Sequence, residues 1–106
     1  MALSNQQIRT LRAETHRLKL KPVVMIGQHG LSESVINELE SSISHHELIK
    51  IRIPALEKSD KKALISSLCE QLNAEEIQNI GHVLVIFRQN PKSKRPESKH
   101  LAKILG

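Results

Sequence analysis

A run of four apolar residues, Val23–Ile26, constrains the fold of this chain more than any other feature. Pro22 precedes the run and the segment Gly27–Gly30 follows it. An unbroken apolar run of this length between turn residues is typical of a strand covered on both faces. Apolar residues then return at helical spacing over 32–45, and alternating residues over 48–53 predict a half-buried strand. A strand, a helix and a second strand favour parallel pairing, so we expect an α/β sheet.

Four further segments are expected to form regular structure: a helix over 4–18, a helix over 59–72 capped by Ser59, and two strands over 76–80 and 83–88. Gly81-His82 joins the two strands as a tight hairpin turn, so they pair antiparallel. The predicted fold is a compact single α/β domain with a four-stranded mixed sheet. Its order is helix, strand, helix, strand, helix, strand, strand.

Residues 1–88 are predicted to form the folded domain, and residues 89–106 a basic C-terminal tail. The first part of the tail is rich in Pro, Lys and Ser, which is typical of a mobile segment. A short helix is predicted near its end, over 100–105.

Charge is concentrated at the two ends of the chain. Residues 1–21 hold five basic residues against one acidic residue, and residues 88–106 hold six against one. The middle, 22–87, holds five basic and nine acidic residues. Two basic ends on an acidic body indicate a polyanionic partner, and a merely solubilising tail is the alternative.

Composition excludes several classes of function. Phe87 is the only aromatic residue, so base stacking on aromatic platforms is excluded and a nucleic acid would be held mainly through phosphates and sugars. The single cysteine, Cys69, excludes an intramolecular disulfide and a multi-cysteine metal site. No apolar run approaches the about 20 residues of a membrane span. The N-terminus lacks the apolar stretch of a signal peptide, and we expect a cytoplasmic protein.

The segment Gly27-Gln28-His29-Gly30 lies between the first predicted strand and the second predicted helix. Glycines there allow a ligand backbone to approach closely, and the free N–H groups and dipole of the helix favour an anionic phosphate. The GxxG loop of KH-like domains clamps a nucleic-acid backbone in this way. The alternative is a tight turn that needs glycine only for its dihedral angles.

Basic residues on the neighbouring elements extend this hypothesis. Lys50 and Arg52 share the strand face opposite the isoleucines, where they could contact phosphates or simply face solvent. The candidate nucleic-acid-binding residues are Arg9, Arg12, Lys21, Gly27, Gln28, His29, Gly30, Lys50, Arg52 and Arg88.

The segment His45-His46-Glu47 contains residue types found in metal and acid–base sites. Adjacent residues on a helix do not face one another, and no third ligand stands at a suitable spacing. Histidines at a helix C-terminus explain the segment better. The sequence also offers no nucleophile–base pair and no carboxylate dyad, so we expect no catalysis, cofactor, metal or small-molecule substrate.

Several of these segments recur together in a known family: Lys21–Val24 with Ile26–Leu31, then His45–Lys50, then Ile80-Gly81 with Leu84-Val85. In this combination the chain resembles the YhbY-like RNA-binding proteins, which are stand-alone bacterial versions of the CRM domain (chloroplast RNA splicing and ribosome maturation). The resemblance covers about residues 3–88. It implies a fold similar to the C-terminal domain of bacterial translation initiation factor three.

The resemblance also implies a function. Bacterial members of the family associate with precursors of the large ribosomal subunit and bind RNA through the GxxG loop and nearby basic surface. Carried over, the resemblance implies a non-catalytic protein whose partner is large-subunit ribosomal RNA or a pre-ribosomal particle, and we expect a cytoplasmic monomer. Two alternatives remain, a protein-interaction adaptor and a DNA-binding module, and in both the glycine loop is only structural.

Overall fold

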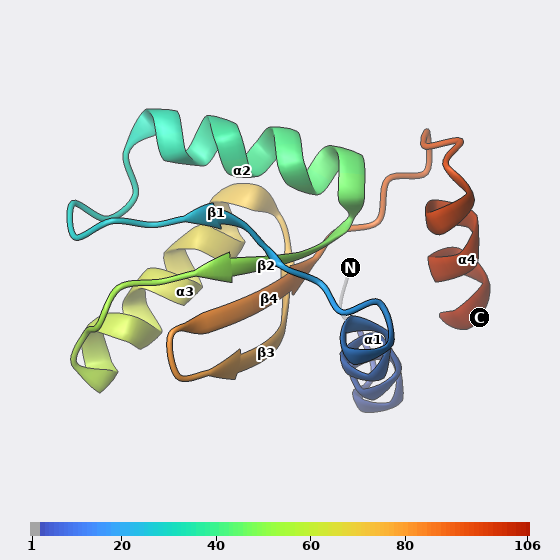
Figure 1. Ribbon diagram of the computed structural model, residues 1–106, viewed down its shortest axis with the longest axis horizontal. Coiled ribbons are helices and arrows are strands. Elements are labelled where there is room, and N and C mark those ends of the chain that lie inside the picture. Colours follow the sequence, from blue (N-terminus) through green and yellow to red (C-terminus); the bar gives the residue numbers. More distant parts are fainter. Residues whose placement is uncertain (1–2) are drawn as a thin grey trace.

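The computed structural model describes residues 3–106 and has the predicted order of helices and strands (Figure 1). The helices are α1 (Asn5–Arg17), α2 (Glu33–His46), α3 (Lys58–Leu72) and α4 (Pro96–Ile104). The strands are β1 (Pro22–Met25), β2 (Leu48–Arg52), β3 (Glu75–Ile80) and β4 (Val83–Phe87). No helix in this part of the chain is both long enough and apolar enough to cross a membrane.

The four strands form one mixed sheet in the order β1-β2-β4-β3. β1 pairs parallel to β2, because α2 returns the chain to the same end of the sheet before β2 begins. β4 pairs antiparallel with both β2 and β3. The mixed four-stranded sheet predicted from the sequence is confirmed, with β1 and β3 at its edges.

One face of the sheet carries the main hydrophobic core, under α2 and α3 (Figure 1). Ile49, Ile51 and Ile53 point into this core and are each at most 2% exposed. α2 begins as predicted, because the hydroxyl of Ser32 accepts the backbone N–H of Val35 at 3.2 Å. The predicted cap of α3 at Ser59 is wrong. That helix begins at Lys58 without a side-chain cap.

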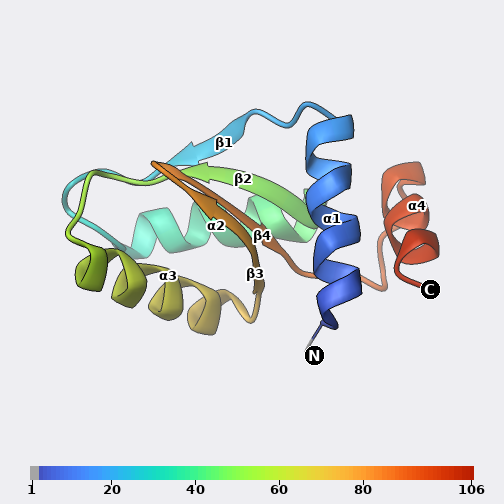
Figure 2. The same ribbon diagram turned by 90° about the horizontal axis from the view of Figure 1, so that it is seen from below.

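The other face is covered only at one end, where α1 crosses the sheet (Figure 2). A second, smaller core lies there, formed by Leu11, Leu48, Ile77, Val85, Phe87 and Leu101. The other half of this face is open. The prediction that Val23–Ile26 is covered on both faces is therefore wrong: Met25 is 69% exposed, because α1 does not reach it.

The C-terminal segment folds back onto the domain. α4 begins at Pro96, four residues before the predicted helix, since proline suits the first position of a helix. Leu101 is buried in the smaller core. The mobility predicted for residues 89–106 stays a prediction, as does the domain boundary at residue 88. Within this segment, α4 packs against α1.

Glu47, between α2 and β2, anchors this segment. Its carboxylate is 1% exposed and accepts the backbone N–H of Asn90 at 2.7 Å and the hydroxyl of Ser98. Its backbone takes a positive φ of 66°, which ends α2 and turns the chain into β2. The segment His45-His46-Glu47 thus has a structural role, in which Glu47 is the buried hydrogen-bond acceptor for the C-terminal segment.

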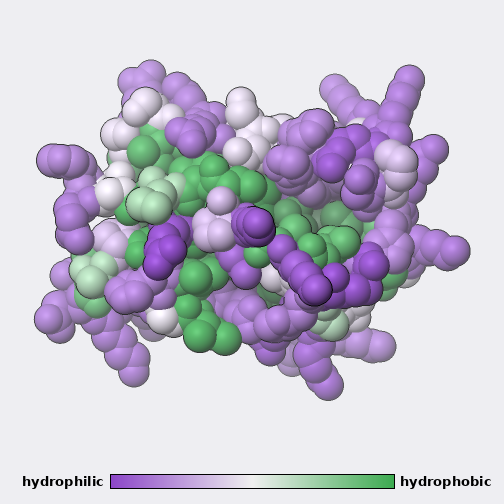
Figure 3. All heavy atoms as spheres, viewed as in Figure 1, coloured by the Kyte–Doolittle hydropathy of each residue, from purple (hydrophilic) through white to green (hydrophobic). Residues whose placement is uncertain are grey.

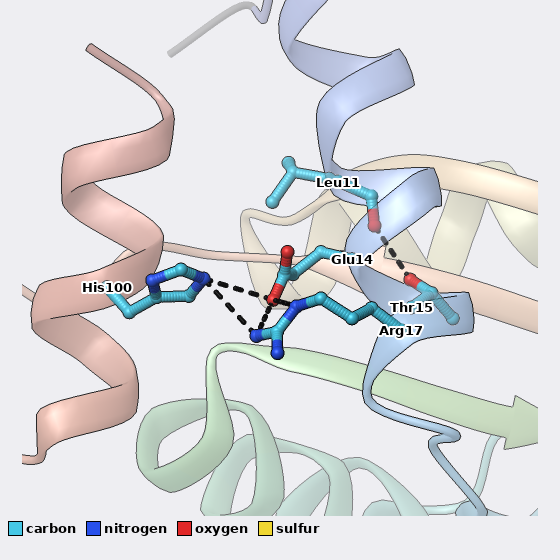
Figure 4. A network of polar contacts seen from close by, with 5 residues as sticks. All are labelled: Leu11, Glu14, Thr15, Arg17 and His100. Atoms are coloured by element: carbon cyan, nitrogen blue, oxygen red, sulfur yellow. Dashed lines mark hydrogen bonds and ion pairs between the residues drawn. The ribbon is translucent and has the colours of Figure 1, made fainter.

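A polar network joins α4 to α1 (Figure 4). Glu14 lies on the α4 side of α1, and its carboxylate is 3.1 Å from Nε2 of His100. The same carboxylate pairs with Arg17, and this hydrogen bond lowers the pKa of Glu14 below its ordinary value. The network neutralises Arg17 and leaves no unpaired negative charge on this side of α1.

Replacing Glu47 by alanine is expected to lower the free energy of unfolding by about 1–3 kcal/mol, because Asn90 and Ser98 lose their buried hydrogen-bond acceptor. Alanine and glutamate are equally strained at positive φ, so the backbone contribution cancels. Urea unfolding measures the change. The exposed Glu57→Ala is the matched control, and equal stability of the two variants would refute the anchoring role of Glu47.

Candidate nucleic-acid interface

The GxxG loop follows β1 and forms a hydrogen-bonded turn, in which the N–H of Gly30 donates to the carbonyl of Gly27 at 3.1 Å. Gly30 has a positive φ of 76°, which side chains other than glycine rarely adopt. Gly27 has no such φ, and a Cβ built on it would meet no atom of residues 3–106 within 4 Å. The turn therefore explains Gly30 but gives no reason for a glycine at position 27.

The loop lies at one end of the sheet, to the left in Figure 1. Its approach is fixed by the strands, because the N–H of Ile26 donates to the carbonyl of Arg52 at 2.8 Å, directly after β1 ends. Ile26 is buried in the main core, whereas Gln28 and His29 are exposed at the tip. The loop thus projects into solvent at Gln28 and His29, and Ile26 joins it to the sheet.

Lys50 and Arg52 stand on the partly open face of the sheet. Both alternate with the buried isoleucines of β2 and therefore point away from α2 and α3. Arg52 pairs with Met25 of β1, two residues before the loop. Arg52 is exposed and Lys50 is half-buried nearer to α1.

The basic residues of α1 border the same open half of the sheet. The guanidinium of Arg12 donates to the carbonyl of Ile77 in β3 at 3.2 Å, which turns this side of α1 toward the sheet. Arg9 and His16 lie about one helical turn before and after Arg12, on the same side. α4 packs on the other side of α1 (Figure 2). Lys21, exposed, directly precedes β1.

Arg88 is not brought together with these residues. It follows β4 at the end of the sheet opposite the loop, because β4 runs antiparallel to β2. Its guanidinium pairs with Glu40 of α2 and also donates to the hydroxyl of Ser44 and to the carbonyl of Leu72, at 2.7 and 2.8 Å. These contacts tie α2, α3 and β4 together and occupy the side chain.

The remaining predicted cations carry free charge. Within residues 3–106, the ion pairs involve the side chains of Arg17, Arg88, Arg95 and His100. Arg9, Arg12, Lys50 and Arg52 are in none of them. The open half of the sheet is therefore a surface of uncompensated positive charge beside the loop.

No group of three His, Cys, Asp or Glu residues within residues 3–106 is placed to hold a metal ion. Burial raises the pKa of the Cys69 thiol to about 11, so the thiol stays protonated at neutral pH.

The sequence analysis did not identify two apolar residues on the open half of the sheet, Met25 and Ile80, whose side chains are exposed. Their exposure depends on how far α1 reaches.

The Glu40–Arg88 pair gives the protein a pH-dependent contribution to stability. The hydrogen bond from Arg88, and then that from Ser44, lowers the pKa of Glu40 from 4.5 to about 2. Because the folded value is below the unfolded one, the contribution is complete above pH 4.5 and is lost as the pH falls toward 2. Glu40 is 48% exposed, so we expect about 0.5–1 kcal/mol relative to Glu40→Gln at pH 7. Urea unfolding of both proteins at pH 7 and below pH 3 measures it, and a difference that does not shrink in acid contradicts the pairing.

Comparison with known proteins shows the family of this chain. Residues 3–88 match the CRS1 / YhbY (CRM) domain. The chain is 37% identical over 95 residues to a protein of Pseudomonas aeruginosa named a probable RNA-binding protein, and the alignment covers 90% of this chain and 89% of that protein. It is 37% identical over 92 residues to an RNA-binding protein of Haemophilus influenzae, covering 87% and 91% of the two chains.

The fold also has a close match among solved structures. The solution structure of a hypothetical protein from Staphylococcus aureus superposes with a TM-score of 0.74 at 32% sequence identity, covering 88% of this chain and 95% of that one. With the domain match over residues 3–88, these similarities show that the chain belongs to the CRS1 / YhbY (CRM) domain family.

Proposed function

We propose that this protein is a non-catalytic RNA-binding protein that acts in the assembly of the large ribosomal subunit. RNA binding is supported by the names of its relatives in Pseudomonas aeruginosa and Haemophilus influenzae. The ribosomal role rests on the resemblance to bacterial YhbY-like proteins. The partner is structured ribosomal RNA, held mainly by its backbone because the chain lacks aromatic stacking platforms.

The observation that carries the binding mode is the open space at Gly27. Neither its backbone conformation nor any neighbouring atom in the described part of the chain requires a glycine there. A ligand backbone that lies against the loop would require one, because a Cβ would keep it at a distance. In this binding mode a phosphate sits at the loop and the first turn of α2, where it meets the backbone N–H groups other than that of Val35, which the Ser32 hydroxyl already accepts.

The surrounding cations neutralise further phosphates. Arg52 and Lys50 lie on the open sheet face, Arg9 and Arg12 border it from α1, and Lys21 precedes β1. Each phosphate contact releases condensed counterions, so this part of the affinity depends on salt. Arg88 contributes to the fold and not to this surface.

Gly27→Ala is expected to leave the stability unchanged or raise it by up to about 1 kcal/mol, since the new methyl group meets nothing and reduces the freedom of the unfolded chain. Its affinity for purified large-subunit ribosomal RNA should fall about tenfold, because the added Cβ separates the loop from the RNA backbone. Filter binding measures the affinity and thermal unfolding the stability. Gly30→Ala is the contrasting variant, which should destabilise the turn through its positive φ. A stable Gly27→Ala protein that binds like wild type would contradict the clamp.

The ribosomal role is tested in cell lysate by sucrose-gradient sedimentation. Wild type should travel with large-subunit particles, and a folded Gln28→Asp/His29→Asp variant at matched expression should stay at the top, because both new carboxylates repel phosphate. Circular dichroism checks the fold of the variant. Wild type at the top of the gradient would refute the ribosomal assignment. Co-sedimentation of both proteins would show that the loop is only a turn.

A further inference from the structure

One residue from each of the four strands forms a row across the open face, at the loop end of the sheet. The backbone register gives the neighbours: Met25 with Arg52, Arg52 with Val83, and Val83 with Ile80. In neighbouring strands, paired residues point to the same face. The row therefore lies opposite α2 and α3, on the half that α1 does not cover.

Two of the three apolar members of this row are unusually exposed, and the third, Val83, is half-buried. Met25 is 69% and Ile80 65% exposed, and these are the two highest values among the large apolar residues of the described chain. Val23, also on β1, is 41% exposed. Figure 3 shows apolar side chains gathered at the surface over the strands, with hydrophilic side chains beside them. Exposed apolar patches rimmed by polar groups mark binding sites.

The charge around the row is positive. Arg52 stands in the middle of it, and no member of the row is acidic. Lys50 lies on the same face of β2, two residues before Arg52, and the guanidinium of Arg12 in α1 donates a hydrogen bond to the carbonyl of Ile77 in β3. An apolar surface with a guanidinium at its centre matches a ligand that combines flat apolar faces with negative charge.

We propose that this row, Met25–Arg52–Val83–Ile80, is a docking surface for unpaired nucleotides of RNA. Bases lie against the apolar side chains and the plane of the Arg52 guanidinium, while their phosphates meet Lys50 and Arg12. The proposal rests on the proposed function and deepens it, because it states which form of RNA the surface selects. Three strand spacings of about 4.8 Å give the row a width of about 14 Å, enough for a short run of bases.

The row is continuous with the loop. Met25 lies two residues before Gly27, and the backbone hydrogen bond from the N–H of Ile26 to the carbonyl of Arg52 joins the start of the loop to the row. A strand whose phosphate sits at the loop therefore leads its neighbouring nucleotides onto the row. A duplex cannot use the row in this way, because its bases are stacked inside the helix and it presents hydroxyls and phosphates. The row thus distinguishes unpaired from paired RNA.

The test compares wild type with Met25→Thr/Ile80→Thr, which removes the apolar surface without changing charge. Both side chains are mostly exposed, so the fold should be retained, and circular dichroism and thermal unfolding check this. Fluorescence anisotropy measures binding of a labelled single-stranded oligouridylate and of a labelled RNA duplex of the same length. We expect the variant to bind the single strand about fivefold more weakly and the duplex as wild type does.

Two further variants sharpen the test. Leu56→Thr removes an exposed apolar side chain from the connection to α3 and should bind both probes like wild type. Arg52→Lys keeps the charge but loses the planar guanidinium, so it should weaken binding of the single strand alone.

The other outcomes overturn the proposal in distinguishable ways. A double variant that binds both probes like wild type would show that the row does not contact RNA, and the clamp at the loop would stand. Equal losses for both probes would assign the row to backbone contacts shared by the two forms. A change in the oligomeric state of the double variant, measured by light scattering, would assign the row to protein association. Wild type that binds neither probe nor ribosomal RNA would remove the proposed function as well.

Discussion

The side-chain alternation of β2 determines both the core and the binding surface. Successive residues of a strand point to opposite faces, so burial of Ile49, Ile51 and Ile53 under α2 and α3 places Lys50 and Arg52 on the other face. A slip of one residue would bury both charges, and the register is therefore strongly specified. The apolar residues that remain for α1 to cover lie at the far end of this face, which leaves the loop end open.

Much of the fold could be predicted because it is encoded locally. Helical and alternating periodicities located seven elements, and the parallel crossover and the hairpin then set the mixed sheet. Coverage of β1 could not be predicted, since it depends on where α1 lies in space. The same holds for Arg88, whose partner Glu40 is 48 positions away, and for Glu47, whose partners belong to the C-terminal segment.

The candidate site shows the same division between local and distant information. The sequence identified the loop and the cations, but it does not distinguish the roles of the two loop glycines, Gly27 and Gly30. In the structure they differ: the dihedral angles of the turn require Gly30, and no contact among the residues that the structure describes requires Gly27. The two interpretations of the motif, a tight turn and a close approach to a ligand, therefore apply to different residues of one loop. Substitutions can separate them for that reason.

The position of α4 explains why the apolar row stays uncovered. With Leu101 and Ile104 packed against the smaller core, α4 is an amphipathic helix of the kind that could cover an open sheet face. In the structure, Glu47 instead accepts hydrogen bonds from Asn90 and Ser98 at the end of the sheet opposite the loop, so the segment that leads into α4 starts away from the row. The network of Glu14 and His100 then fixes α4 on the far side of α1 (Figure 4). The buried anchor at Glu47 and the basic and apolar surface thus lie at opposite ends of the domain.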